Sequence, residues 1–285
     1  MRRITLTSFL SALAGRALLL AALFCGSAQA DGFSVEALIE KSGLGAQLDV
    51  MPRSIKIGFG HALKQGTLRL SAEQIRDIHV VFDRAYAPQK LRAMMVERIP
   101  ARIDAETGAR IIAFLDSPLG QRIVEKEAQL AQPKIQSEIQ ENAAKIVADI
   151  GANSSRLALY AALDRAMEST QRGVAAYIGS ALASAAAVLA KMPDSPERPT
   201  LEQIRKNLDG QRLAIAAAMS QAVLSNSAYA YKDLSEEDLN AYLQFALSPD
   251  GVAYSRGVGD LFAEVLVECA ADVGRLSAAQ RQGPI

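Results

Sequence analysis

The sequence has few of the side chains that carry most enzyme chemistry. Tryptophan is absent, aromatic residues make up 5% of the 285 residues, and cysteine and histidine occur only twice each. The chain therefore has neither the clustered cysteines and histidines of a zinc site nor a Cys-x-x-Cys pair. It also lacks a Gly-x-Ser-x-Gly elbow, a His-Glu-x-x-His helix and a phosphate-binding loop. These absences predict a protein that is not an enzyme and has no catalytic centre, no bound metal and no cofactor.

The two histidines, His61 and His79, are the only side chains that ordinarily titrate near neutral pH. His61 has no acid within helical reach, whereas Asp83 follows His79 by one helical turn. Such a pair can bind a metal, but it is also common on solvated helix faces, and we favour the solvated interpretation. The acidic runs at residues 125–127 and 236–238 resemble paired glycosidase carboxylates. An exposed helix face and a helix start explain these runs better.

Residues 1–30 have the composition of a secretory signal peptide. An arginine pair near the start precedes an apolar run that ends at Phe24, and a small-x-small site follows at residues 28–30. This order predicts cleavage before Asp31 and an exported, periplasmic protein. Cys25 does not fit a lipoprotein attachment site, because such a site needs a small residue where Phe24 stands. We therefore expect a soluble protein with no transmembrane segment after cleavage.

The chain also lacks an excess of positive or negative charge. Lysine plus arginine and aspartate plus glutamate both number 31, and cleavage would remove three arginines and no acids, leaving a formal charge of about −3. A near-neutral surface gives no electrostatic reason to bind nucleic acid or anionic lipid. Cleavage would also leave Cys269 as the one cysteine, so no internal disulfide is possible. Its apolar neighbours, Val265 and Leu266 among them, favour a buried thiol over pairing with another chain.

What is abundant is apolar, helix-forming sequence. Half of the residues are apolar, alanine is frequent and aromatics are rare, which is typical of an all-α protein. Ser71-x-x-Gln74 and Thr200-x-x-Gln203 have the pattern of capping boxes, and each predicts a helix start. Gly43 predicts a helix end. The helix that begins after Thr200 is expected to continue through residue 223.

The sequence Phe-x-x-Ser-Pro-x-Gly occurs twice. The copies comprise Phe114, Ser117, Pro118 and Gly120, and Phe245, Ser248, Pro249 and Gly251. Proline fits the first position of a helix and forces the preceding residue out of the helical region, so each serine is a predicted N-cap. Each copy predicts a short helix, a sharp corner and a second helix that the glycine lets approach closely. After the first corner that second helix is expected to reach Ile150, with some loosening near Pro133. An anion bound at the helix start is the alternative role.

The first copy resembles a bacterial family known as domain of unknown function 2059. That family pairs an acidic helix start with an aromatic residue and then Ser-Pro-Leu-Gly, as in Glu106, Phe114 and residues 117–120 here. The resemblance covers residues 35–127 and, more weakly, 200–260, where Asp250 departs from the pattern. It implies an exported helical protein without an established activity, and it supplies no catalytic residues.

The helical composition and the duplicated Phe-x-x-Ser-Pro-x-Gly segment together predict a multi-helix bundle built from two related helical units. The first unit spans residues 31–192, a proline-rich linker spans 193–199, the second unit spans 200–276 and a mobile tail spans 277–285. Whether the units pack as one domain is left open. The uncharged stretch at residues 173–190 is mostly alanine, glycine and serine, so we expect a buried helix contacted on several sides rather than a membrane segment.

Two functions fit this pattern. The first is a non-catalytic interaction module that binds another envelope protein or a second copy of the chain. The alternative is a periplasmic carrier, in which Phe59, Phe82, Met94 and Met95 line a pocket for an apolar ligand between helices. Methionine near aromatic residues suits a pocket and also suits a filled core, so an open cavity along these side chains would favour the carrier.

Overall fold

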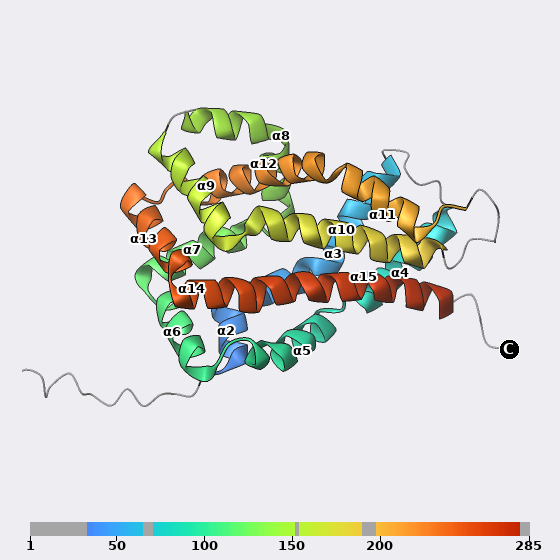
Figure 1. The fold of residues 1–285 in the computed structure, drawn as a ribbon, viewed down its shortest axis with the longest axis horizontal. Helices are drawn as coiled ribbons and strands as arrows, with labels where there is room; N and C mark the ends of the chain where they lie inside the picture. Colours follow the sequence, from blue (N-terminus) through green and yellow to red (C-terminus); the bar gives the residue numbers. More distant parts are fainter. Residues whose placement is uncertain (1–32, 65–70, 152–153, 190–197, 280–285) are drawn as a thin grey trace, which may run out of the picture. The chain divides into compact units, whose positions relative to one another are not determined.

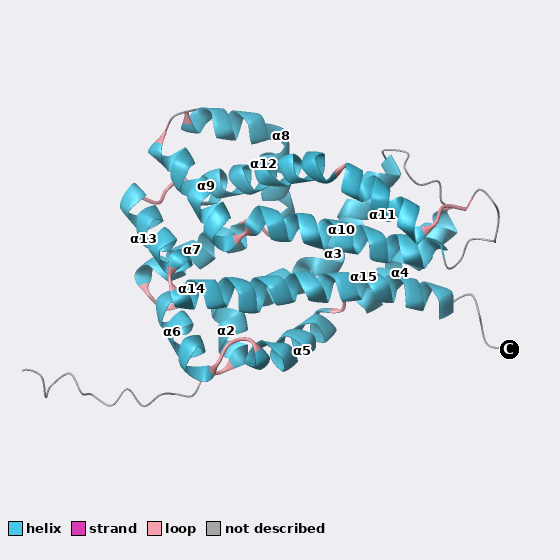
Figure 2. Cartoon of the chain, viewed as in Figure 1, coloured by secondary structure: helices cyan, strands magenta, loops and turns pink. Residues whose placement is uncertain are grey.

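The computed structural model describes residues 33–64, 71–151, 154–189 and 198–279. These ranges contain helices and no strand, so the prediction of an all-α protein is confirmed (Figures 1 and 2). The first helices are α2 (Val35–Lys41), α3 (Leu44–Lys64), α4 (Ala72–Ala85), α5 (Pro88–Arg98), the short 3₁₀ turn η2 (Ile99–Ala101), α6 (Ala105–Leu115) and α7 (Pro118–Gln129). They are followed by α8 (Pro133–Ile150), α9 (Ser155–Met167), α10 (Ser169–Leu189), α11 (Leu201–Gly210), α12 (Arg212–Ala230), α13 (Glu236–Leu247), α14 (Pro249–Tyr254), the π-turn η3 (Ser255–Asp260) and α15 (Leu261–Ala279).

Some sequence predictions fall outside these ranges. The predicted signal peptide at residues 1–30 lies outside the described residues, as does most of the predicted linker. Helix α15 continues to Ala279, so the first three residues of the predicted tail are helical, and residues 280–285 are not described. None of the helices in the described ranges combines the length and the apolar character that a membrane span requires.

Local capping chemistry sets most helix starts, as the sequence predicts. Ser71 and Thr200 each accept a hydrogen bond from the glutamine three residues on, whose side chain in turn accepts one from the backbone N–H of the cap. These reciprocal bonds satisfy two of the donors that a helix start leaves unpaired. Gly43 has a φ of +73°, the left-handed conformation that ends a helix.

Two helices that the sequence predicts as continuous are broken. The helix after Ser117 ends at Gln129, and α8 begins afresh at Pro133, which has no N–H to continue the hydrogen-bond ladder. Likewise, the helix after Thr200 ends at Gly210, and α12 begins at Arg212. After the first break α8 packs against α12, and Leu130 and Ala131 of the connection line the cavity described below.

Helices α10 and α15 form the most extensive pair, and Figure 1 shows them side by side. Arg172 of α10 meets Asp260, and Gly179 meets Val267, so both helices advance in the same direction. On another face of α10, Gly173 meets Met219 of α12. These close approaches confirm the expectation of a helix contacted on several sides, because its small residues leave room for neighbouring side chains. The expectation that the helix is buried is wrong, because one face meets solvent and Tyr177 is 52% exposed.

The two Phe-x-x-Ser-Pro-x-Gly segments form the predicted corners, α6–α7 and α13–α14. The hydroxyls of Ser117 and Ser248 each accept a hydrogen bond from a glycine N–H at 3.1 Å, and each lies within 2.7 Å of the phenylalanine carbonyl three residues earlier. The corners also pack on one another: α6 contacts α14 and α7 contacts α13. Ion pairs join Arg110 to Asp250 and Arg122 to Asp238 across these contacts.

Helices from the two predicted units interleave. Helix α15 packs against α4, α5 and α10, and α12 packs against α8 and α9. Cys269 of α15 lies at 0% exposure with a free thiol, as its neighbours predict. The described residues from Ser34 onward cluster as one unit, so the core is shared between both predicted halves.

Candidate functional site

Of the four side chains predicted to line an apolar pocket, three are packed in the core and Phe59 is half-buried. Phe59 and Phe82 are in edge-to-face contact, with ring centroids 5.3 Å apart. Phe82, Met94 and Met95 are buried. None of the four side chains lines the cavity described below.

His79 lies against aromatic rings rather than in an acidic cluster. Its ring centroid is 6.0 Å from that of Phe59 and 6.5 Å from that of Phe82. Asp83, the acid one turn on, pairs with Lys56 instead. The side chain of His61 is outside the described part, and within that part no group of three or more His, Cys, Asp or Glu side chains could hold a metal ion.

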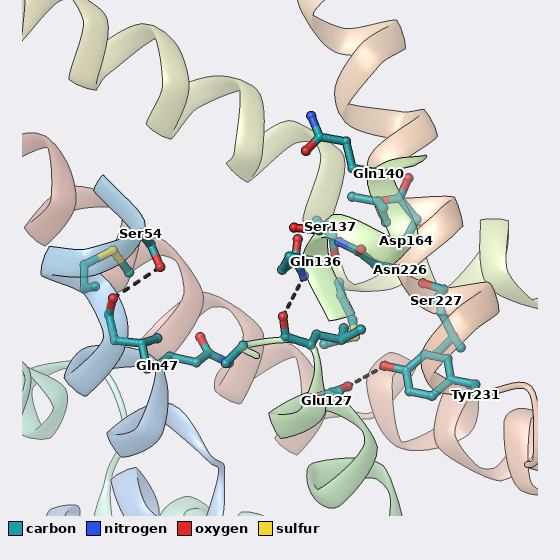
Figure 3. A pocket seen from close by; sticks show the side chains of 18 of the residues that line it. Gln47, Ser54, Glu127, Gln136, Ser137, Gln140, Asp164, Asn226, Ser227 and Tyr231 are labelled. Carbon is teal, nitrogen blue, oxygen red and sulfur yellow. Dashed lines mark hydrogen bonds between the residues drawn. The ribbon is translucent and has the colours of Figure 1, made fainter. Parts of the chain in front are cut away.

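A cavity of about 750 Å³ lies between α3, α7, α8, α9, α12 and α13. Figure 3 shows Gln47 and Ser54 of α3 on one side of it and Asp164, Asn226 and Tyr231 on the other. Much of the wall is apolar, supplied by Val50, Met51, Ile57, Leu130, Leu163, Met167 and Val223. Its size is within the range of small-molecule sites, and apolar walls with a few polar groups are typical of them.

One wall of the cavity carries a carboxyl group held by two tyrosines. Oε1 of Glu127 accepts a hydrogen bond from the hydroxyl of Tyr231, drawn as a dashed line in Figure 3. The hydroxyl of Tyr242 lies 3.1 Å from the same oxygen and 3.4 Å from Sδ of Met167. These groups come together because Tyr231 caps the C-terminus of α12, Tyr242 is on the buried face of α13, and α7 packs against both helices.

Burial shifts the pKa values of this cluster. Desolvation raises the pKa of Glu127, and the hydrogen bonds from the two tyrosines oppose that effect only in part. Burial, followed by the charge of Glu127, raises the pKa values of Tyr231, Tyr242 and Tyr254. The tyrosines therefore stay protonated as hydrogen-bond donors, while the carboxyl group holds its proton to a higher pH than a solvated glutamate.

The basic residues nearest to this cluster bind elsewhere. Lys126, the neighbour of Glu127 in the chain, pairs with Asp233 at 3.1 Å. The guanidinium of Arg156 donates to the carbonyl oxygens of Tyr231 and Leu234. Within the described residues, Glu127 thus has two neutral donors and no basic partner.

Asp164, the other carboxylate of the wall, has a structural role. Its Oδ1 accepts a hydrogen bond from the backbone N–H of Thr170 at 2.8 Å, and its Oδ2 accepts one from the Thr170 hydroxyl at 2.7 Å. Both oxygens therefore serve the start of α10, where carboxylates stabilise unpaired N–H groups. Of the two carboxylates, only Glu127 keeps an oxygen without a partner among the described residues.

The prediction that residues 125–127 lie on an exposed helix face is wrong for Glu127 and correct for Glu125. A signal was present in the sequence: Ile123, Glu127 and Leu130 share a spacing of four and three, which places the glutamate on the apolar face of α7. The serines of the corner motif act as caps, and their hydroxyls are taken up by glycine N–H groups.

Residues 89–149, from α5 to α8, match the model of a family described as an uncharacterized protein conserved in bacteria (DUF2059). The resemblance carried by Phe114 and residues 117–120 is thereby confirmed for this part of the chain. The matched segment includes Glu127 and one wall of the cavity. No curated protein and no solved structure matches the chain.

Proposed function

We propose that this protein is an exported, non-catalytic binding protein that carries a small ligand with an apolar body in the cavity beside Glu127. The observation that supports the proposal is a cavity of about 750 Å³ whose walls come from helices far apart in the sequence. The cavity opens to solvent, because Ser54, Ser137 and Gln140 of its lining are exposed. Concave sites with largely apolar walls between helices are where small molecules preferentially bind. The proposal takes up the carrier function, which the sequence offers as the alternative to an interaction module, and moves its site away from Phe59 and Met94.

Native mass spectrometry of the protein released gently from the envelope of its own cell tests this proposal. We expect a chain that begins at Asp31 with an additional small molecule that organic solvent extracts. A chain that retains residues 1–30 would contradict the export proposal. A bare chain from every preparation would contradict the carrier proposal.

A variant within the cavity makes the test specific. Ser137 of α8 is at the cavity wall and its side chain is exposed, so Ser137→Trp should obstruct the cavity without disturbing the core. Ser184 of α10 is exposed, and the one lining residue of that helix, Ser169, lies about four turns away, so Ser184→Trp is the matched control. We expect the ligand to be lost only from the first variant. Because the chain has no tryptophan of its own, each new indole also reports its surroundings by fluorescence.

The interaction module is the second candidate, and exposed apolar side chains favour it. Leu213 of α12 is 86% exposed, and Tyr177 of α10 and Leu247 of α13 are each more than half exposed. A single exposed apolar side chain costs little free energy and is common on monomers. The interaction module therefore predicts that these side chains are covered together when the protein assembles. Analytical ultracentrifugation of the mature protein and of Leu213→Asp tests this: a self-associating wild type and a monomeric variant would support the module.

We also infer that the two corners derive from a duplicated helical unit. Ser117 and Ser248 have nearly the same backbone conformation, with φ of −65° and −69° and ψ of 156° and 160°. Both corners place a glycine against a phenylalanine carbonyl. An experimental structure tests this inference, because α6–α7 should superpose on α13–α14 beyond the motif itself. If the two corners superpose only at the Ser-Pro turn, common capping chemistry explains their likeness and the inference of a duplication fails.

A further inference from the structure

We infer that the cavity selects a cationic amphiphile, whose ammonium group pairs with Glu127 while its apolar body lies along α3 and α9. This inference rests on the proposed carrier function and adds the chemical class of the ligand.

The first step is the free acceptor on Glu127. Both tyrosine hydroxyls are directed to Oε1, and no other described residue donates to this carboxyl group. Every described side-chain oxygen or nitrogen that is closed to solvent has a hydrogen-bond partner. Oε2 of Glu127 has no such partner among the described residues, so it is open to solvent at the cavity that Glu127 lines. A carboxylate oxygen with a free lone pair, open to a cavity, accepts a donor from a ligand.

The second step is charge. A carboxylate surrounded by protein atoms is costly unless a cation compensates it, and the two tyrosines supply hydrogen bonds without charge. Lys126 and Arg156 are held by Asp233 and by backbone carbonyls, so neither reaches Glu127. A ligand ammonium group would therefore supply a compensating charge that the described residues do not, and charge-assisted hydrogen bonds of this kind are among the strongest in proteins.

The third step is what lies beyond the carboxyl group. Tyr231 and Tyr242 flank it, and their aromatic rings, like the thioether of Met167, tolerate a nearby cation. Val50, Met51 and Leu163 then continue the wall as apolar surface. The cavity thus offers a polar anchor at one wall and apolar contact over the rest, which matches a molecule with one charged end.

An anionic amphiphile such as a fatty acid fits less well. The one basic side chain in the lining is Arg53, which is exposed and makes no ion pair within the described residues. An exposed cation gains little from pairing, because water already solvates it. Bringing a second carboxylate into the cavity would also add repulsion with Glu127 and Asp164.

The test compares two probes that differ only in the sign of the head group. Decylammonium and decanoate, each below its micelle concentration, are titrated calorimetrically into the purified mature protein at pH 7, with 1-decanol as the neutral reference. We expect decylammonium to bind about tenfold more tightly than decanoate, a difference of about 1.4 kcal/mol. In Glu127→Gln the difference should fall below about threefold, whereas Glu125→Gln, an exposed change on the same helix, should leave it intact.

The relative affinities of the three probes decide whether the charge preference stands. Equal or tighter binding of decanoate would overturn the inference and direct attention to Arg53. Binding of all three probes with equal affinity, unaffected by Glu127→Gln, would leave the carrier function standing and remove the charge preference. If no probe binds, the inference fails, and native mass spectrometry of the protein from its own cell decides the carrier function separately. The comparison in the unmodified protein does not depend on whether a variant folds, and circular dichroism checks that Glu127→Gln does.

Discussion

The rings of Phe114 and Phe245 lie stacked, with centroids 3.6 Å apart and planes inclined by 3°. Each ring belongs to one of the two corners, so the equivalent residues of the two motif copies are direct neighbours. Tyr242, which donates to the cavity carboxyl, lies 6.3 Å from Phe114 between ring centroids. The contact between the corners therefore also supports the wall that carries Glu127.

The stacked pair should be energetically coupled. Each ring is partly buried, so we expect Phe114→Ala and Phe245→Ala each to lower the free energy of unfolding by about 2 kcal/mol. The double variant should cost less than the sum of the single variants by about 1 kcal/mol, because the second substitution finds the stack already broken. Urea denaturation of the four proteins measures this coupling, and strict additivity would contradict it.

The corner glycines should not tolerate a methyl group. A Cβ on Gly120 would lie 2.1 Å from the carbonyl oxygen of Phe114, and a Cβ on Gly251 would lie 1.9 Å from that of Phe245. These neighbours are backbone atoms and cannot rotate away, so Gly120→Ala and Gly251→Ala should each cost at least about 2 kcal/mol. Gly60 of α3 is the control: nothing lies within 4 Å of an added Cβ. Gly60→Ala should raise stability by about 0.5–1 kcal/mol.

The pairing of α10 with α15 depends on a similar close approach. A Cβ on Gly179 would lie 2.5 Å from a methyl carbon of Val267. We expect Gly179→Ala to lower the melting temperature, because valine is stiff and the two helices would have to separate. Adding Val267→Ala should restore part of that loss by removing the clash. Thermal unfolding followed by circular dichroism decides this, since a double variant less stable than both single variants would show that the clash is not the cause.

Stability should depend on pH through Glu127. Its pKa is raised in the folded protein, so between the ordinary glutamate pKa of 4.5 and the folded pKa the native state binds more protons than the unfolded state. The contribution of this group to stability is therefore present below pH 4.5 and is lost as the pH rises through the folded pKa. Glu127→Gln removes that dependence, so it should gain stability relative to wild type as the pH rises. Urea unfolding from pH 4 to pH 8 measures this, with Glu125→Gln as the control.

The thiol of Cys269 should be protected in the native protein. It is fully buried, and burial is the main cause that raises its pKa. Since the thiolate is the reactive form, a thiol reagent should label Cys269 only at the rate of local or global unfolding. Labelling in water and in denaturant, read by mass spectrometry, gives the two rates. Fast labelling in water would show that α15 opens readily from α4 and α5.

Local chemistry explains why much of the fold was predictable. The caps at Ser71, Ser117, Thr200 and Ser248 depend on residues within one turn, so the sequence alone identifies them. Pro88 likewise occupies the first position of α5, the place in a helix that proline favours.

The candidate site was harder to predict because its parts come from distant elements. The sequence around Glu127 does not predict that Tyr231 and Tyr242 contact it, because tertiary packing brings these tyrosines to the carboxyl group. The charged neighbours Glu125 and Lys126 made the segment look solvated, although the helical spacing from Ile123 to Leu130 contained the signal. The sequence predicts only a loosening near Pro133, whereas the structure has a full break there, and Leu130 and Ala131 of that break line the cavity.

The contact between the two corners makes the family-matched segment depend on helices outside it. Residues 89–149 carry Phe114 and Ile123, whose apolar partners include Leu239 and Tyr242 of α13. Excised alone, the segment would turn that surface toward water. In this chain the segment therefore does not close a core of its own, and the helices from α12 onward cover its apolar face.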